Sequence, residues 1–123
     1  MNESMRFKAN EVNCYTEIDV TVIGIGDDPS TPDNFIILSR FDEDEDIDNS
    51  IGLMTHLSDI EMINSIKQIT LERNKICFFF KPNKQNKEET ITIDLDIDDS
   101  HFAHLLEYLL LIIKDSSIQL IEK

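Results

Sequence analysis

The most chemically distinctive stretch of the sequence is the acidic run at residues 42–48, where six of seven side chains carry a carboxylate. Its acidic residues are Asp42, Glu43, Asp44, Glu45, Asp46 and Asp48. Carboxylates at alternating positions suit a hard cation such as Ca²⁺, but a 12-residue calcium loop also needs a Gly for its sharp turn and a closing Glu. A loop starting at Asp42 has Ile47 and Leu53 at those positions. The spacing therefore favours a solvated acidic loop or a protein-binding surface.

A second candidate is the segment that begins Gly24-x-Gly26 and continues into Asp27 and Asp28. Two glycines after a strand suggest a phosphate-binding turn, but the third glycine of the dinucleotide fingerprint is absent and no helix is expected to open there. The two aspartates would also repel a pyrophosphate. Nucleotide binding is therefore not expected here. As a hypothesis, Asp27 and Asp28 form the electrostatic part of a partner-binding surface together with the acids of the 42–48 run.

Histidine and cysteine spacing indicates no catalytic or metal site. His56, His101 and His104 do not form an HExxH or related pattern, and the sequence pairs no nucleophile with a base. Cys14 and Cys77 are far apart and lack a CxxC motif, so they suggest neither a zinc site nor a disulfide framework. We expect a non-enzymatic protein with no catalytic residue, no metal and no cofactor.

Two other classes of function stay open on the sequence. One is a metal-dependent hydrolase that uses the carboxylates of Asp27, Asp28 and residues 42–48. The other is a structural protein that forms a large homo-oligomer. Turnover that needs a divalent metal would indicate the first, and a large assembly without a partner would indicate the second.

The elements that must position these residues predict an α+β fold. The chain has 123 residues, the size of one domain, and no linker or internal repeat divides it, so we expect a single domain over 1–123. Apolar alternation and short apolar runs predict a mostly antiparallel sheet of about six or seven strands. The expected strands are residues 6–15, 17–23, 35–38, 66–72, 75–81, 90–97 and 118–121.

Two local features refine that sheet. The run at 35–38 is short and apolar throughout, which is typical of a central strand buried on both faces. Arg73 and Asn74 separate two β-rich runs, and Asn tolerates the left-handed conformation that two-residue hairpin turns use, so a hairpin is expected there.

A single C-terminal helix is expected after Asp98, Asp99 and Ser100, any of which can cap its N-terminus. Its apolar stripe consists of Phe102, Leu105, Leu106, Leu109, Leu110 and Ile113. With this register Leu106 lies near the centre of the stripe, and the stripe is expected to cover the sheet face of Ile91, Ile93, Leu95 and the strand at 76–80.

Net charge restricts the partner. The formal charge is −14 at pH 7 and the isoelectric point is near 4.3, so direct binding to nucleic acid or an anionic membrane is disfavoured and a basic protein partner is favoured. The N-terminus lacks an apolar segment of signal-peptide length, and the longest apolar run, 109–113, is far too short to span a membrane. We expect a cytoplasmic protein, and the sequence leaves its oligomeric state open.

Several segments in the first 60 or so residues match a known pattern in order. They are Phe-Lys-Ala-Asn-Glu-Val at 7–12, Ile-Gly-Ile-Gly-Asp-Asp-Pro at 23–29, Pro-Asp-Asn-Phe-Ile-Ile-Leu-Ser-Arg at 32–40, Asp-Glu-Asp-Ile at 44–47 and Gly-Leu-Met at 52–54. This order resembles the immunity-protein-10 family of bacterial polymorphic-toxin systems. The resemblance implies a protein that binds a cognate toxin domain and protects the cell that produces it. If so, the acidic side chains would dock on a toxin surface that is basic because the toxin's own substrate is anionic.

Overall fold

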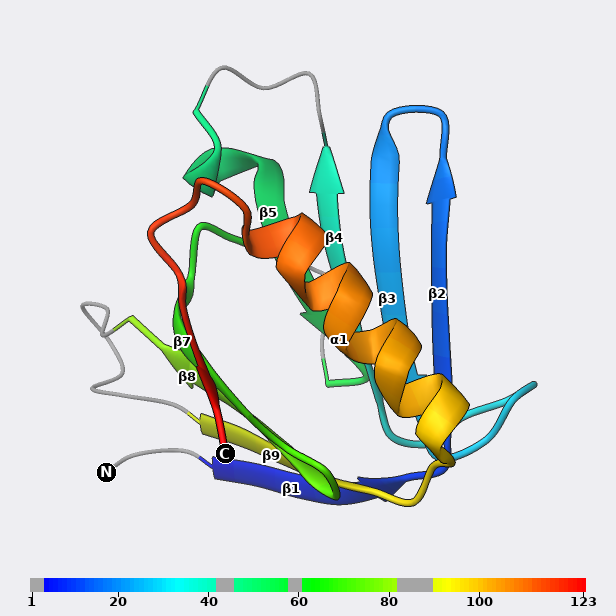
Figure 1. The fold of residues 1–123 in the computed structure, drawn as a ribbon. Coiled ribbons are helices and arrows are strands. Elements are labelled where there is room, and N and C mark those ends of the chain that lie inside the picture. The colour runs from blue at the N-terminus through cyan, green and yellow to red at the C-terminus, as the bar shows by residue number, and fades with distance from the viewer. Residues whose placement is uncertain (1–3, 42–45, 58–60, 82–89) are drawn as a thin grey trace.

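Two β-sheets and one helix make up the structure, a computed structural model that describes residues 4–41, 46–57, 61–81 and 90–123 (Figure 1). The first sheet, which we term the mixed sheet, has the strand order β1-β9-β8-β7-β10. Its strands are β1 (Ser4–Ala9), β9 (Thr90–Leu95), β8 (Lys75–Phe80), β7 (Ile66–Glu72) and β10 (Gln119–Glu122). The β1–β9 and β7–β10 pairs are parallel, and the other pairs are antiparallel.

The second sheet, which we term the meander sheet, is antiparallel throughout and follows chain order. Its strands are β2 (Glu11–Glu17), β3 (Val20–Gly26), β4 (Phe35–Phe41), β5 (Ile51–Thr55) and β6 (Met62–Ile63). A 3₁₀ turn, η1 (Asp48–Ser50), precedes β5, and helix α1 (Asp99–Ile113) precedes β10.

The α+β class and the single helix near the C-terminus are confirmed, but the strands are divided between two five-stranded sheets. The division starts at Asn10, where the segment expected as one strand over 6–15 leaves the mixed sheet as β1 and enters the meander sheet as β2. The Asn10 backbone N–H donates to the Gly26 carbonyl at 3.1 Å and anchors the crossing to the end of β3. Alternation along a strand does not reveal which sheet the strand joins, so this switch has no local signal.

The strand expected over 17–23 is interrupted by a tight turn. β2 ends at Glu17, which pairs with Val20 across a two-residue connection formed by Ile18 and Asp19. Ile18 has a φ of 53° and is 91% exposed. Its apolar character completes the alternation in the sequence, but in the fold its side chain lies in solvent at the tip of a hairpin.

The hairpin at Arg73–Asn74 is confirmed, with Glu72 paired to Lys75 across the turn. The reason offered for it was wrong. Among the non-glycine residues described by the structure, only Ile18, Asn64 and Asp115 have a positive φ. The turn therefore forms without a left-handed Asn74.

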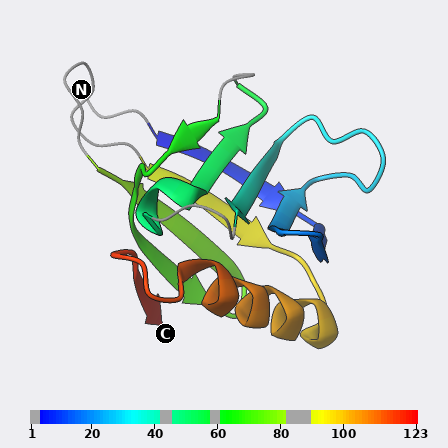
Figure 2. The ribbon, with the colours of Figure 1, turned by 90° about the horizontal axis from the view of Figure 1, so that it is seen from above.

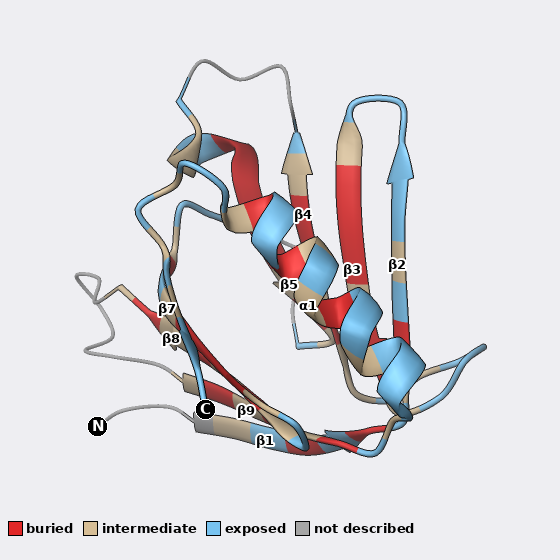
Figure 3. Ribbon diagram, viewed as in Figure 1, coloured by how far each residue is buried: buried red, intermediate tan, exposed pale blue. Residues whose placement is uncertain are grey.

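One continuous core joins the inner faces of both sheets to the helix, as the red segments of Figure 3 show. The mixed sheet contributes alternate residues, among them Ile93, Ile76 and Phe78, which are fully buried. Its outer face is mostly polar, with Phe79 and Ile121 among the exceptions, and carries an ion pair in which Arg6 Nη2 lies 2.9 Å from Asp94 Oδ1. This sheet thus has the ordinary division into an apolar inner face and a wet outer face.

Helix α1 packs in a different place from the one expected. It runs alongside β2 and β3, on one side of the meander sheet, whereas Ile91, Ile93 and Leu95 belong to the mixed sheet (Figures 1 and 2). Leu105, Leu109 and Ile112 are fully buried, while Leu106 is only partly buried. The buried line is rotated relative to the predicted stripe, because the helix packs beside β2 and β3. None of the described helices is long and apolar enough to cross a membrane.

Two arginines hold the ends of this helix. Arg40 Nη1, from β4, donates to the carbonyls of Leu111, Ile112 and Lys114 at 3.1, 2.9 and 2.7 Å. A cation at this end complements both the unpaired carbonyls and the helix dipole. At the other end Arg73 lies 5.1 Å from the Phe102 ring centroid and pairs with Asp99 at 2.7 Å.

Candidate partner-binding surfaces

The described acidic residues of the predicted surface lie at opposite ends of the meander sheet. Asp27 and Asp28 are in the loop that precedes β4, whereas Asp46 and Asp48 follow that strand (Figure 1). A strand of seven residues such as β4 extends for about 20 Å. The structure therefore does not bring these two pairs together. Four further predicted residues lie outside the described part of the chain: Asp42, Glu43, Asp44 and Glu45.

Asp27 and Asp28 shape their own loop. Asp27 Oδ1 accepts hydrogen bonds from the backbone N–H groups of Asp33 at 3.0 Å and Asn34 at 3.3 Å, and Oδ2 accepts from Asn34 Nδ2 at 2.9 Å. Asp28 Oδ1 accepts from the backbone N–H groups of Ser30 at 2.8 Å and Thr31 at 3.0 Å. The loop thus presents both carboxylates in a definite conformation.

These hydrogen bonds also favour the ionised form of the two carboxylates. The pKa of Asp27 lies below its usual value, chiefly because the Asn34 side chain donates to it. The pKa of Asp28 is also lowered, because the Thr31 and Ser30 backbone N–H groups donate to its charged form. Both side chains are therefore negative at neutral pH, as an electrostatic binding surface requires.

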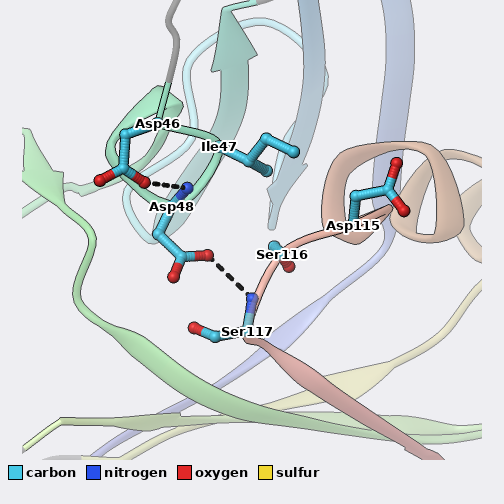
Figure 4. A pocket seen from close by; sticks show the side chains of 6 residues that line it. All are labelled: Asp46, Ile47, Asp48, Asp115, Ser116 and Ser117. Carbon is cyan, nitrogen blue, oxygen red and sulfur yellow. Dashed lines mark hydrogen bonds between the residues drawn. The ribbon is translucent and has the colours of Figure 1, made fainter.

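Asp46 and Asp48 line an open hollow of about 640 Å³ with Ile47, Asp115 and two serines, Ser116 and Ser117 (Figure 4). Asp48 Oδ1 accepts from the Ser117 backbone N–H at 2.8 Å and so fastens the segment before β5 to the one after α1. Asp46 Oδ1 accepts from the Asp48 backbone N–H at 3.1 Å. The pKa of Asp48 is lowered, chiefly by the hydrogen bond from the Ser117 backbone.

The described carboxylates do not converge on one centre. Asp27 and Asp28 are separated from Asp46 and Asp48 by the length of β4, so the two pairs cannot bind one metal ion together. Within the described ranges, no group of three or more His, Cys, Asp or Glu side chains is placed to hold a metal.

His56, His101 and Cys14 make contacts that support the fold. His56 Nδ1 accepts from the Phe35 backbone N–H at 3.1 Å, and its ring lies edge-on to Phe7 with centroids 5.9 Å apart. His101 Nδ1 lies 2.6 Å from Asp98 Oδ1, and Asp98 caps the helix through the His101 backbone N–H. Burial raises the pKa of the Cys14 thiol to about 11, so this side chain is a protonated thiol at neutral pH.

The outer face of the meander sheet, turned away from α1, is a surface that the sequence interpretation missed. On this face the strand pairing aligns Tyr15 with Val22, Val20 with Phe41, and Gly24 with Ile37. Six of the side chains on this face are apolar, and one of them, Val22, is buried. Glu11, Asn13, Glu17 and Ser39 share the face with them. We term the set Tyr15, Val20, Val22, Phe35, Ile37 and Phe41 the outer apolar face.

Two hollows adjoin the outer apolar face. One, of about 430 Å³, includes Gly24, Gly26, Ile37 and the loop residues Asp28 and Pro32 in its lining. A Cβ at Gly24 would have only one neighbouring atom within 4 Å, the Asn13 carbonyl oxygen at 3.8 Å. The missing side chain at Gly24 therefore leaves open space rather than meeting a packing requirement.

The second hollow, of about 460 Å³, lies at the other end of the outer apolar face. Its lining includes Tyr15, Ile18, Val20 and Phe41. Tyr15 is 43% exposed and Phe41 is 46% exposed, so aromatic surface is available to a partner there.

Two sequence features belong to this face, but neither predicts an exposed apolar surface when the sequence is considered alone. The Gly24-x-Gly26 motif was weighed only as a phosphate-binding turn. The run at 35–38 was expected to be buried on both faces, but Ile36 and Leu38 are buried while Phe35 and Ile37 are only partly covered.

No family model matches this chain, and no curated protein matches it. The resemblance to the immunity-protein-10 family therefore stays a prediction.

Proposed function

We propose that this protein is an immunity protein, a cytoplasmic, non-enzymatic inhibitor that binds a cognate toxin domain and covers the toxin's active surface. The observation that carries the proposal is the acidic loop at 27–34, whose carboxylates are ionised and held in place beside an open apolar sheet face. A surface with these properties suits a basic protein.

The acidic side chains and the apolar contacts have separate roles in the proposed inhibition. Residues 11–41 contain six acidic side chains and one basic side chain, Arg40, which contacts the end of α1. The acidic groups would accelerate encounter with a basic toxin surface, and apolar contacts would then supply much of the affinity. Because many toxins act on anionic substrates, covering a basic surface would block substrate access.

The direct test is survival of cells that express the toxin domain encoded beside this gene, with and without this protein. The proposal expects survival only when the protein is co-expressed, together with a stable complex of the two purified chains. Equal killing in both cultures would contradict it.

The hydrolase alternative predicts a different result. It requires the protein alone to turn over a substrate in the presence of Mg²⁺, Mn²⁺ or Ca²⁺ and to lose this activity with a chelator. Under the proposed function, a chelator leaves protection and complex formation unchanged.

A further inference from the structure

We infer that the outer apolar face, with the hairpin tip at Ile18, is the docking surface for a protein partner that has an apolar centre and a lysine- or arginine-rich rim. The inference rests on the proposed function, because the toxin domain is the partner in question. In this inference the centre of the binding surface is the outer apolar face, and the acidic loops lie at its margin.

The first argument is the contrast between the two sheets. The outer face of the mixed sheet carries Arg6, Asp94, Lys75 and Glu72, which form ion pairs in solvent. The corresponding face of the meander sheet carries apolar side chains from β3 and β4, with Tyr15 from β2, and its polar residues lie mainly on the edge strand β2. An antiparallel sheet that needed only to be soluble would present polar side chains there.

The second argument is the conformation of Ile18. A β-branched residue at a φ of 53° is strained, and the first position of a two-residue hairpin connection with positive φ favours Gly. With 91% of its surface exposed, Ile18 gains little from packing in the free protein. A side chain that costs backbone strain and makes few contacts is explained if it enters the partner.

The third argument is charge at the margin of the face. Glu11 and Glu17 lie on the outer side of β2, Asp19 lies in the hairpin turn, and Asp28 lines the hollow of about 430 Å³. Three strands of this length cover only about 20 by 15 Å, less than the roughly 800 Å² that each partner contributes to a standard interface. A stable interface must therefore include these acids, and they complement a basic rim.

A second copy of this chain fits poorly on the same face. Two such faces would bring Glu11, Glu17, Asp19 and Asp28 of one copy near the same acids of the other. Like charges placed together in an interface are strongly unfavourable. The rim thus selects a basic partner over self-association.

The principal test uses Ile18→Gly, which relieves strain and removes the exposed side chain. We expect a higher Tm, because the backbone strain is relieved. We also expect the affinity for the purified toxin domain to fall about tenfold, because a few anchoring side chains dominate most interfaces. A variant that folds better and binds worse cannot owe its weaker binding to unfolding. Unchanged affinity together with a raised Tm would overturn the contribution of the hairpin tip.

A second variant, Gly24→Val, places a side chain in the hollow of about 430 Å³ that Gly24 and Ile37 line. Strand geometry favours Val and the Cβ position is open, so the fold should be retained. We expect the affinity for the toxin domain to fall about tenfold or more, because the added side chain occupies space that the partner needs. The matched control is Phe79→Ser on the outer face of the mixed sheet, which should leave affinity unchanged.

The outcomes separate this inference from the proposed function. If the wild-type protein rescues cells and Ile18→Gly and Gly24→Val rescue equally well, the function stands and this docking surface is wrong. If the wild-type protein neither binds the toxin domain nor rescues cells, the proposed function fails, and this inference fails with it. The wild-type protein could also sediment as a dimer that Gly24→Val abolishes. This result would show that the face binds a second copy of the chain, and it would contradict the inference of a basic partner.

Discussion

Asp48 and Arg40 are single side chains that join segments far apart in the sequence. Asp48 accepts from the Ser117 backbone, and Arg40 donates to three carbonyls at the end of α1. Both contacts hold the chain around the C-terminal end of the helix. Each contact involves a charged side chain, so each can be tested by replacing that side chain alone.

The Asp48 contact predicts a pH-dependent stability. Its folded pKa lies below the unfolded value of about 3.9, so its contribution is complete above about pH 5 and is lost as pH falls through the folded pKa. Asp48→Asn cannot ionise and lacks this contribution at every pH. We expect the difference in unfolding free energy between wild type and Asp48→Asn to shrink from pH 6 to pH 3, measured by urea unfolding. A difference that is constant over this range would contradict the prediction.

The Arg40 contact predicts a loss of stability at the C-terminal end of α1. Arg40→Ala leaves the last helix carbonyls without their cationic donor and should cost about 1–3 kcal/mol in urea unfolding. Lys114→Ala is the control, because Lys114 is exposed at the same helix end and should change stability by less than about 0.5 kcal/mol. Equal losses in the two variants would mean that the guanidinium contacts are not stabilising.

Helix α1 illustrates how packing selects one line of residues from a broad apolar stripe. Leu105 and Leu109 are completely buried, whereas Leu110 is 49% exposed. The sequence pattern treated these residues as equivalent and placed Leu106 at the centre. The position of the helix beside β2 and β3 determines which of them leave water.

Alanine substitutions along the helix should follow the observed burial. Leu105→Ala should cost about 2–5 kcal/mol, Leu110→Ala under about 1 kcal/mol and Glu107→Ala under about 0.5 kcal/mol. Leu106→Ala, for which the sequence alone predicts the full loss, should fall between Leu105 and Leu110. Chemical unfolding of the four variants measures this order. A larger loss at Leu110 than at Leu105 would mean that the helix is rotated in solution.

At the scale of the whole molecule, a charge of −14 makes association dependent on ionic strength. Neutralising the six acids of residues 42–48 to Asn and Gln should slow association with the toxin domain and flatten its salt dependence. Stopped-flow association at several salt concentrations measures both quantities. Stability should fall only by the part that Asp48 contributes through Ser117. An unchanged rate at low salt would show that these acids do not contribute to steering.

Local patterns in the sequence were sufficient for the elements whose signals are complete within a few residues. The strand predicted at 90–97 is confirmed as β9 over Thr90–Leu95, and the hairpin at Arg73–Asn74 is confirmed. Of the three predicted capping residues, Asp98 caps α1. Each depends on the period of side chains along one segment or on a cap next to its helix. The acidic character of the loops was equally plain, because composition sets charge.

Only the tertiary structure decided which elements meet. The exchange of sheets at Asn10, the exposure of Ile18 and the placement of α1 beside β2 and β3 depend on contacts between distant segments. The outer apolar face could not be predicted for the same reason. The apolar run at 35–38 has the same sequence pattern whether one face or both faces of its strand are covered by other elements. The sequence of a strand shows that its side chains alternate between two faces. The packing of the rest of the chain determines which of these faces stays exposed to solvent.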